Sequence, residues 1–539
     1  MSPAKRVHAE IFEAEGYRHE FFFFPSHNLH LVSLRQLFPM QTRSLYAAID
    51  LGSNSFRLEI GQMDSGQMRR VEYIKETVRQ GNGLDADRNL TQEAMERGWD
   101  CLARFGERIA GFKPSQVRAV ATQTLREARN RDVFLGKAKQ ILGFPIEVIA
   151  GREEARLIYS GVSHLLPQSN ERRLVVDIGG RSTEIILGQH ETAQVMESYR
   201  VGSVGWSMKY FPDGQWTAPA FKAAEIAAKA VLDEASSLFS PDQWQRCYGS
   251  SGTVGAVADV LNAAGWPEGC ITRESLAWLK ERLLKAQKFD NLRLEGIKED
   301  RRPVIGGGLA VLLAVFDLLQ IDEMHAAQGA LRHGTLYDLI DREGPQDMRS
   351  SMVDSLAQRF GVDKLQADRV SQTAQSVMAS LINSRPSEAD SEQQRLFKKL
   401  HWACQVHEAG MRISHSDYHK HGAYILDNTD LPGFTLDELH RLSQLVLGHR
   451  GKLRKLETQL EDISFVQQLM ALRLAVILCH ARRDPDLSGL RLECDTERRT
   501  TQLHMASTWA ELWPQSAHLL REEKNAWQKT DWSLTVHMD

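Results

Sequence analysis

The sequence has no pair of closely spaced cysteines. Its six cysteines are spread between Cys101 and Cys494, and none of them forms a C-x-x-C pair. This spacing gives no support to a zinc site or to a disulfide framework, and it favours a reducing, cytoplasmic location.

A long apolar run is also missing. The longest uncharged apolar run, which contains Gly306 to Phe316 and begins at Val304, has 13 residues, whereas a membrane-spanning helix needs roughly 20. Residues 1–44 lack the apolar region and the cleavage site of a signal peptide. We therefore expect no integral membrane segment, and we interpret residues 306–316 as part of a core.

No excess of charge of one sign is present. The chain has 66 Lys and Arg residues and 70 Asp and Glu residues, which give a formal net charge of −4. Because no global positive field would draw such a chain to nucleic acid, we expect no nucleic-acid partner. A polyanionic ligand would have to meet a local basic surface.

The length of 539 residues predicts more than one domain. Strand-like and helical segments alternate in the first part, which indicates α/β lobes, whereas the periodicity from Asp347 to Arg483 is almost wholly helical. We expect five segments: an N-terminal extension whose order the sequence leaves open (1–44), a first lobe (45–157), a second lobe (158–342), a helical domain (343–489) and a small C-terminal α/β segment (490–539).

An internal repeat is the most informative feature that is present. Residues 49–61 align without a gap with residues 176–188, and the Asp, the Gly, the Ser and the closing Gly coincide. An apolar strand precedes each Asp and a strand-like run follows each Ser, so each copy predicts a hairpin with a tight turn. Strands at 117–121 and 146–149 alternate with helices at 92–109, 131–142 and 153–163. The duplication therefore predicts two α/β lobes that face each other across a cleft.

Each copy of the repeat can cradle a phosphate. A strand that ends in Asp-x-Gly and continues into small residues exposes several backbone N–H groups at one point. The candidate phosphate-binding residues are Gly52, Ser53, Asn54 and Ser55 in the first copy and Gly179, Gly180, Arg181, Ser182 and Thr183 in the second. Asp50 and Asp177 end the two strands, where a carboxylate can hold Mg²⁺ directly or through water.

A third glycine-rich turn covers residues 249–253 and opens a helical run at 254–261. The amides and the dipole of such a helix can face an anion, which makes Ser251, Gly252 and Thr253 candidates for phosphate binding. A plain loop with a helix cap explains the turn equally well when it is considered alone.

Together the three turns resemble those of the superfamily of acetate kinase, Hsp70 and actin. Within it, the sequence is most similar to the exopolyphosphatase and guanosine pentaphosphate phosphatase family. The similar segments are residues 46–56, 121–126, 151–158, 175–184, 251–253, 329–332, 415–421 and 430–434. This resemblance implies an α/β fold with two actin-like (ribonuclease H-like) lobes, a C-terminal all-α HD-like domain and a small α/β tail. It also implies Mg²⁺ as cofactor and a homodimer.

The resemblance also assigns roles to single residues. It places the general base at Glu154, and it places Asp177, Gly179 and Glu184 at the active site, with Glu184 as a second catalytic residue and metal ligand. Arg126 and Arg57 are candidate donors to phosphate oxygens, because a planar guanidinium suits bidentate contacts. Hydrolysis of a phosphoanhydride requires such a set of metal, donors and carboxylate. Without the resemblance, a solvated ion pair at a helix end would be the simpler interpretation of Glu154.

The sequence departs from the family pattern at three places. Arg181 replaces the usual third glycine of the second turn, and Gln328 and His333 replace two carboxylates of the family. In the HD-like domain, His407-Glu408 lies where His-Asp would bind metal, but Val476 lies where a later ligand would be expected. We interpret that domain as a metal-free relic.

These features favour an exopolyphosphatase that releases terminal orthophosphate from inorganic polyphosphate processively and with Mg²⁺. A 5′-phosphohydrolase of guanosine pentaphosphate is the alternative, because both substrates end in the same phosphoanhydride. A sugar or acetate-type kinase shares the fold. A degenerate regulator that binds polyphosphate or nucleotide is suggested by Arg181 and His333.

Overall fold

The computed structural model describes residues 12–14, 17–19, 45–64, 67–341, 348–382 and 391–538. The chain separates into two compact units, Met1–Ser44 and Leu45–Asp539. In the first unit the described residues form one short antiparallel pair, β1 (Phe12–Ala14) with β2 (Tyr17–His19). The sequence analysis left open whether residues 1–44 are ordered, and most of these residues lie outside the described ones.

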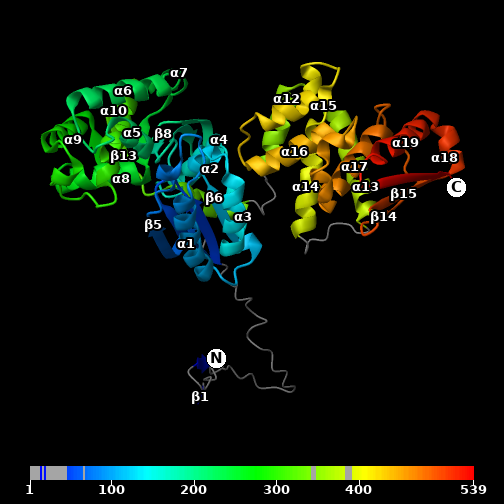
Figure 1. Cartoon of the computed structure of the whole chain (residues 1–539), viewed down its shortest axis with the longest axis horizontal. Coiled ribbons are helices and arrows are strands. Elements are labelled where there is room, and N and C mark those ends of the chain that lie inside the picture. The colour runs from blue at the N-terminus through cyan, green and yellow to red at the C-terminus, as the bar shows by residue number, and fades with distance from the viewer. Residues whose placement is uncertain are drawn as a thin grey trace, which may run out of the picture. The chain divides into compact units, whose positions relative to one another are not determined.

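The first lobe is built on a five-stranded sheet, coloured blue to cyan in Figure 1, with the order β5-β4-β3-β6-β7. β3 pairs antiparallel with β4 and parallel with β6. Large apolar side chains from the sheet and from α1 and α3, among them Phe56, Phe105 and Phe134, fill the core beside it. The elements are β3 (Leu45–Leu51), β4 (Phe56–Asp64), β5 (Gln67–Glu76), α1 (Gln92–Arg108), β6 (Val117–Ala121), α2 (Gln123–Glu127), α3 (Arg131–Leu142) and β7 (Ile146–Val148).

The second lobe is built on a six-stranded sheet with the order β10-β9-β8-β11-β13-β12. The longest apolar run of the sequence lies in α10, whose residues Gly306 to Leu312 are all buried, so it belongs to the core as expected. The elements are β8 (Arg172–Ile178), β9 (Thr183–Gln189), β10 (Thr192–Tyr199), α5 (Ser203–Tyr210), α6 (Ala218–Leu232), α7 (Ala235–Leu238), β11 (Arg246–Ser250), α8 (Ser251–Ala263), β12 (Cys270–Thr272), α9 (Arg273–Ala286), α10 (Ile305–Leu318) and β13 (Glu323–Ala326).

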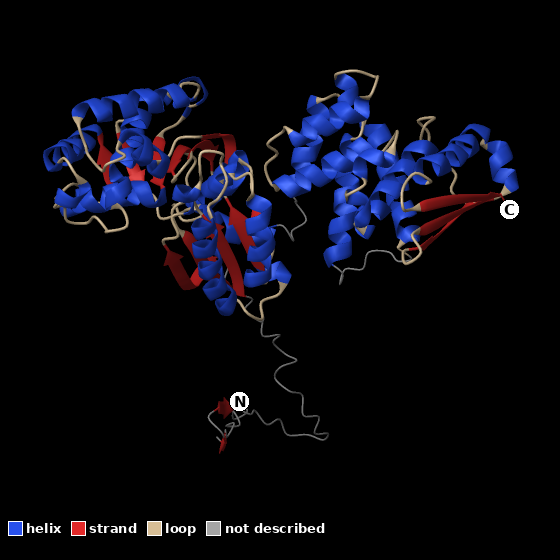
Figure 2. Cartoon of the chain, in the orientation of Figure 1, coloured by secondary structure: helices blue, strands red, loops and turns tan. Residues whose placement is uncertain are grey.

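The predicted repeat is present as two equivalent hairpins. β3 pairs with β4 so that Asp50 lies opposite Arg57, and β8 pairs with β9 so that Asp177 lies opposite Glu184. Helices lie beside both sheets, as Figure 2 shows. The prediction of two α/β lobes from the duplicated motif is confirmed.

Two helices join the lobes. α4 (Gly151–Ser163) leads from β7 of the first lobe to β8 of the second, and α11 (Leu331–Asp341) packs against it. The backbones touch at glycines: a Cβ atom at Gly334 would lie 1.8 Å from the carbonyl oxygen of Leu157, and one at Gly161 would lie 2.3 Å from that of Ala330. This close approach requires glycine at both positions.

The helical domain and the C-terminal segment share one apolar core, which includes Trp402, Trp527 and Trp532. A three-stranded sheet with the order β14-β15-β16 lies in the C-terminal segment. No helix in the described ranges is long and apolar enough to cross a membrane. The elements are α12 (Met348–Arg359), α13 (Lys364–Leu381), α14 (Ser391–Val406), α15 (Tyr418–Asp427), α16 (Leu436–Gly448), α17 (Ile463–Leu478), β14 (Leu490–Asp495), β15 (Thr500–Met505), α18 (Ser507–Leu512), α19 (Pro514–Trp527) and β16 (Ser533–Met538).

Candidate functional site

The two hairpin turns, the third glycine-rich turn and the helix α4 line one cavity of about 310 Å³. Most residues that the sequence singled out take part. The cavity is lined by Asp50, Gly52, Ser53, Asn54, Ser55, Arg57, Glu154, Asp177, Gly179, Gly180, Ser182, Ser251, Gly252 and Thr253, together with other residues.

The turns of the two hairpins meet face to face. A Cβ atom at Gly180 would lie 3.0 Å from the Cβ of Ser53, so the second turn approaches the first at van der Waals distance. The backbone of each turn is held from outside: the amide of Gly81 donates to the carbonyl of Ser53 at 2.7 Å, and that of Val204 donates to the carbonyl of Gly180 at 2.8 Å. The two predicted phosphate cradles therefore line one cavity.

The third turn opens α8, as the sequence predicts. Ser251 is its first residue and has a φ of +93°, a backbone conformation that costs energy for any residue other than glycine. Its hydroxyl oxygen accepts a hydrogen bond from the amide of Thr253 at 3.1 Å. The amides at a helix start can face an anion.

The sequence did not point to Arg301, which covers this helix start. A Cβ atom at Gly252 would lie 2.1 Å from the guanidinium of Arg301. The side chain is 9% exposed, and its one ion pair with a described residue is to Asp300 at 3.8 Å. Burial, followed by the nearby charge of Arg57, lowers the pKa of Arg301. A cation held beside another cation and a helix N-terminus suits an anionic ligand.

Three buried carboxylates lie at or next to the cavity. Glu154 lies in the first turn of α4, and its Oε2 atom is 2.7 Å from Nη1 of Arg126. Burial raises the pKa of Glu154 although the charge of Arg126 opposes this shift. Burial is also the main cause that raises the pKa of Asp177 to about 7. Glu184 is fully buried, and burial together with the charges of Glu154 and Asp177 raises its pKa well above the usual range.

The two halves of the repeat differ in how their charge is balanced. In the first half, Asp50 forms an ion pair with Arg57, its cross-strand neighbour, at 2.9 Å. In the second half, the equivalent neighbours Asp177 and Glu184 are both acidic. The hydroxyl of Ser198 donates to Oε1 of Glu184 at 2.7 Å, but Oε2 has no hydrogen-bond partner among the described residues. Among the described residues, the second half therefore has no ion pair like that between Asp50 and Arg57.

This acidic pair bears on the expected magnesium. No group of three or more His, Cys, Asp or Glu side chains within the described ranges is arranged to hold a metal by itself. Mg²⁺, however, commonly binds through one or two carboxylates and completes its shell with water and substrate phosphates. The orphaned oxygen of Glu184 and the raised pKa of Asp177 indicate a place where a cation would be stabilising, so these residues fit a Mg²⁺–phosphate complex.

Four predicted site residues lie behind the lining of the cavity: Arg126, Arg181, Thr183 and Glu184. Arg126 holds Glu154 and also donates to the carbonyl of Ile149 at 2.9 Å. The Thr183 hydroxyl donates to the carbonyl of Val201 at 2.6 Å. The phosphate contacts expected of Arg126 and Thr183 therefore stay predictions, since these donors have partners within the protein.

Arg181 is also engaged within the protein. Its guanidinium pairs with Glu127 at 2.9 Å and donates to the carbonyl of Gly81 at 3.0 Å, and both partners belong to the first lobe. Its φ is not among the positive values of the described chain, so the turn needs no glycine there. In this geometry Arg181 ties the second turn to the first lobe, and its direct phosphate contact stays a prediction.

The other departures from the family pattern lie in different surroundings. Gln328 lines the cavity, whereas His333 is buried outside it, with Nε2 3.4 Å from Oε1 of Glu59. In the helical domain, His407 Nδ1 donates to the carbonyl of Cys404 at 2.7 Å, and Glu408 pairs with Arg482 at 2.8 Å.

Comparisons with known proteins agree with this geometry. The model of the Ppx/GppA phosphatase family matches residues 60–343, and the model of domain III of that family matches residues 348–524. A guanosine-5′-triphosphate,3′-diphosphate pyrophosphatase of Vibrio atlanticus is 38% identical over 494 residues, which are 91% of this chain and 98% of that protein. A protein of the same name from Aeromonas hydrophila is 38% identical over 502 residues, 92% of this chain and 99% of that protein.

Solved structures that are similar to this chain cover about half of it. An exopolyphosphatase-like protein has a TM-score of 0.50 and 27% identity, and it covers 55% of this chain and 97% of its own. An exopolyphosphatase from Cytophaga hutchinsonii also has a TM-score of 0.50, with 22% identity over 55% of this chain and 98% of its own, and it is similar in fold. On these matches over both lobes and the helical domain, the chain belongs to the Ppx/GppA phosphatase family.

Proposed function

We propose that the protein hydrolyses the terminal phosphoanhydride of the 5′-triphosphate of guanosine pentaphosphate and releases orthophosphate. The relatives named for this activity match nearly the whole chain at 38% identity. They support guanosine pentaphosphate, the alternative in the sequence-based prediction, better than inorganic polyphosphate, which that prediction preferred.

The observation that carries the proposal is the convergence of two phosphate cradles on a cavity that Glu154 also lines. The amides and hydroxyls of the two turns would hold the β- and γ-phosphates. Water then attacks the γ-phosphorus, the bond from that phosphorus to the bridging oxygen breaks, and the tetraphosphate leaves. Glu154 accepts the proton of the attacking water, and a raised pKa suits a group with that task.

Arg126 and the burial of α4 keep this base in place. Arg126 engages Oε2 of Glu154 at 2.7 Å and leaves its other oxygen for the water. Asp177 and Glu184, with Asp50 nearby, are the residues that would hold Mg²⁺. When bound, this ion would neutralise charge on the phosphates. Ser251, Gly252, Thr253 and Arg301 would bind a more distant phosphate of the substrate.

Inorganic polyphosphate is the second candidate substrate. It is supported by the number of cationic side chains that line the same cavity, which suits a polyanion: Arg57, Lys75, Lys298, Arg301 and Arg332. An exopolyphosphatase-like protein is also similar to the lobes at 27% identity.

A phosphate-release assay tests the proposal. Purified protein with Mg²⁺ is given guanosine pentaphosphate or long-chain polyphosphate, and kcat/KM is compared, with the Glu154→Gln variant as the background control. We expect the higher kcat/KM for guanosine pentaphosphate. A higher value for polyphosphate would favour the second candidate, and no release from either substrate by the wild-type protein would contradict a hydrolase.

A further inference from the structure

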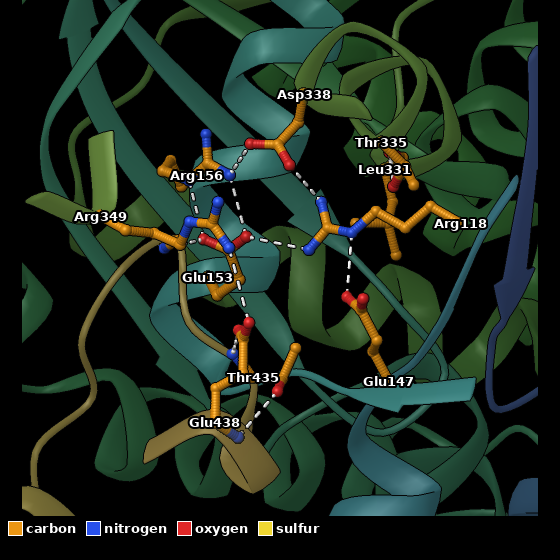
Figure 3. A network of polar contacts seen from close by, with 11 residues as sticks. Arg118, Glu147, Glu153, Arg156, Leu331, Thr335, Asp338, Arg349, Thr435 and Glu438 are labelled. Carbon is orange, nitrogen blue, oxygen red and sulfur yellow. Dashed lines mark hydrogen bonds and ion pairs between the residues drawn. The ribbon is translucent and has the colours of Figure 1, made fainter. Parts of the chain in front are cut away.

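A buried ionic network that includes residues of α4 lies outside the lining of the cavity (Figure 3). Arg118 of β6, Glu153 and Arg156 of α4 and Asp338 of α11 are its centre, and each is at most 8% exposed. Arg118 donates to Asp338 at 2.5 Å and to the carboxylate of Glu147 at 3.0 Å, and Arg156 also pairs with Asp338. Two guanidinium charges are thus neutralised inside the protein.

Glu153 is the member that connects all parts of this network. Its carboxylate accepts hydrogen bonds from Nε of Arg156 at 2.7 Å, from Nη2 of Arg156 at 2.9 Å and from Nη2 of Arg118 at 3.4 Å. Its Oε2 atom also accepts a hydrogen bond from the backbone N–H of Gly433, at an N···O distance of 2.6 Å. Gly433 belongs to the helical domain. A fully buried carboxylate with this many donors has little rotational freedom.

The loop that supplies this N–H is itself held firmly. Gly433 has a φ of +89°, which favours glycine. The next residue, Phe434, is fully buried and packs edge-on against Trp402, with ring centroids 5.0 Å apart. Thr435 then caps α16 and forms a β-bridge with Ile149, two residues before α4 begins. The helical domain therefore presents the N–H of Gly433 from a fixed position.

Glu153 and Glu154 are neighbours in the first turn of α4 but are anchored in different directions. Consecutive residues of a helix are rotated by about 100°. Glu153 faces the network and Gly433, while Glu154 pairs with Arg126 and lines the cavity. The amide of Glu154 donates to the carbonyl of Ala150 at 2.9 Å, the first hydrogen bond of this turn. Fixing the carboxylate of Glu153 thus fixes the rotation of the turn that carries Glu154.

We propose that Glu153 is a positioning residue for the general base, Glu154. Through the hydrogen bond from the N–H of Gly433 to Glu153, the helical domain helps to orient Glu154. The proposal rests on the hydrolase function proposed above. It means that the helical domain acts on catalysis through the start of α4 without contributing a side chain to the cavity.

The test compares kcat, KM and amide exchange in matched variants. Glu153→Gln keeps the size of the side chain but loses the charge. We expect kcat to fall by about tenfold to a hundredfold with KM nearly unchanged, since a displaced catalytic group costs rate more than binding. Asp338→Asn is the matched control, because it removes a carboxylate that faces the same two arginines from α11. The two variants should lose similar stability, but Asp338→Asn should retain most of kcat.

A second variant tests the helical domain. In Gly433→Ala the new Cβ would lie 2.9 Å from Cγ of Arg349, in a backbone conformation that alanine disfavours, so the loop must shift. Gly361→Ala, at a φ of +64° with nothing within 4 Å, is the control for backbone strain alone. We expect Gly433→Ala to lower kcat, and we expect the Glu153→Gln/Gly433→Ala double variant to be no slower than Glu153→Gln. If the two losses multiply, or if the losses lie in KM, the proposal is overturned.

Hydrogen exchange separates failure of this proposal from failure of the hydrolase function, because it needs no substrate. Glu153→Gln and Gly433→Ala should each speed exchange in the first turn of α4 by about tenfold, while Gly361→Ala should leave it unchanged. Unchanged exchange in both test variants would overturn the proposal even in an active enzyme. A wild-type protein that releases no phosphate would instead refute the hydrolase, whatever the exchange data show.

Discussion

Acidic side chains at the cavity are kept out of water to an unusual degree. Glu154, Asp177 and Glu184 are each less than one-tenth exposed, and one arginine, Arg126, pairs with one of them. Burying carboxylates with so little compensation costs stability unless they are protonated or meet a cation. Such a cost is commonly found at functional sites, where a raised pKa prepares a group for proton transfer.

The first prediction concerns Glu154. Glu154→Gln should lower kcat for phosphate release by about 10²–10⁴, because the amide keeps the shape but cannot take the proton of water. KM should change little. The exposed Glu107 on α1 offers a control, since Glu107→Gln has the same chemistry far from the cavity. Near-normal release by Glu154→Gln would remove the role of general base from this residue.

Glu59 on β4 is also a buried carboxylate, but its pKa is lowered and not raised. Arg332 lies 2.6 Å and Arg70 lies 3.0 Å from its oxygens. Burial by itself would raise the pKa of Glu59, but the hydrogen bonds and charges of His333, Arg332 and Arg70 outweigh it and lower the pKa to about 2. The ionised form is therefore stabilising above the unfolded-state pKa, and this stability is lost as the pH falls toward 2.

Chemical unfolding of the wild-type protein and Glu59→Gln should reveal this dependence. At pH 7 the variant should have a lower free energy of unfolding, by about 3 kcal/mol for a pKa shift of this size. The difference should shrink as the pH is lowered from about 4.5. A difference that does not vary with pH would mean that Glu59 contributes by packing and not by its charge.

Among the elements, α4 and α11 cross with their backbones in close contact. α4 holds Glu153 and Glu154, and α11 begins at the Gly329-Ala-Leu-Arg332 segment and holds Asp338. The approach of their backbones depends on Gly161 and Gly334. These two helices therefore fix where Glu154 lies with respect to the turns of the second lobe.

Gly334→Ala should be strongly destabilising, because its Cβ would lie 1.8 Å from the carbonyl oxygen of Leu157 and the helices would have to separate. Overpacking costs typically 1–3 kcal/mol, and a clash with backbone belongs at or above the top of that range. The control is Gly136→Ala on the exposed face of α3, where nothing lies within 4 Å. That variant should be more stable by about 0.5–1 kcal/mol. Equal thermal shifts for both variants would contradict the packing argument.

The elements also show what the sequence could predict. The two hairpins were predictable because the pattern that specifies each one is local: an apolar strand, Asp, a small-residue turn and a second strand. β6 (Val117–Ala121) and α3 (Arg131–Leu142) were predicted with the bounds that the structure has. By contrast, the sequence did not predict β14 and β16, and β16 pairs in parallel with β15 across the whole of α19. Such a pairing leaves no trace in local periodicity.

The site was predictable to a similar extent. Residues within the repeated turns line the cavity because the motif places them there. The partners of Arg181 and the position of Arg301 over Gly252 arise from contacts between segments that are distant in sequence. A single charged residue in an irregular segment carries no pattern, so neither could be found without the folded chain.

At the scale of the whole chain, the C-terminal segment completes the helical domain. Arg473 of α17 is buried and makes two hydrogen bonds to Glu523 of α19, at 2.5 and 2.7 Å. Arg473 also donates to the carbonyl of Gly448, and Trp527 donates to Glu523 at 2.7 Å. Arg473, three residues before Val476, thus binds the C-terminal segment.

The last prediction tests this connection. Removing one partner of a buried ion pair leaves the other charge unpaired and costs about 3–5 kcal/mol, whereas replacing both by apolar side chains is often neutral. Glu523→Gln should therefore lower the midpoint of unfolding clearly, and Arg473→Met/Glu523→Met should restore most of the loss. Urea unfolding followed by tryptophan fluorescence is suitable, because Trp527 and Trp532 are buried beside the pair. If Glu523→Gln unfolds like the wild-type protein, the tail does not stabilise the helical domain through Arg473. A double variant that is as unstable as the single one would place the stabilising role in the hydrogen bonds to Gly448 and Trp527, and not in the ion pair.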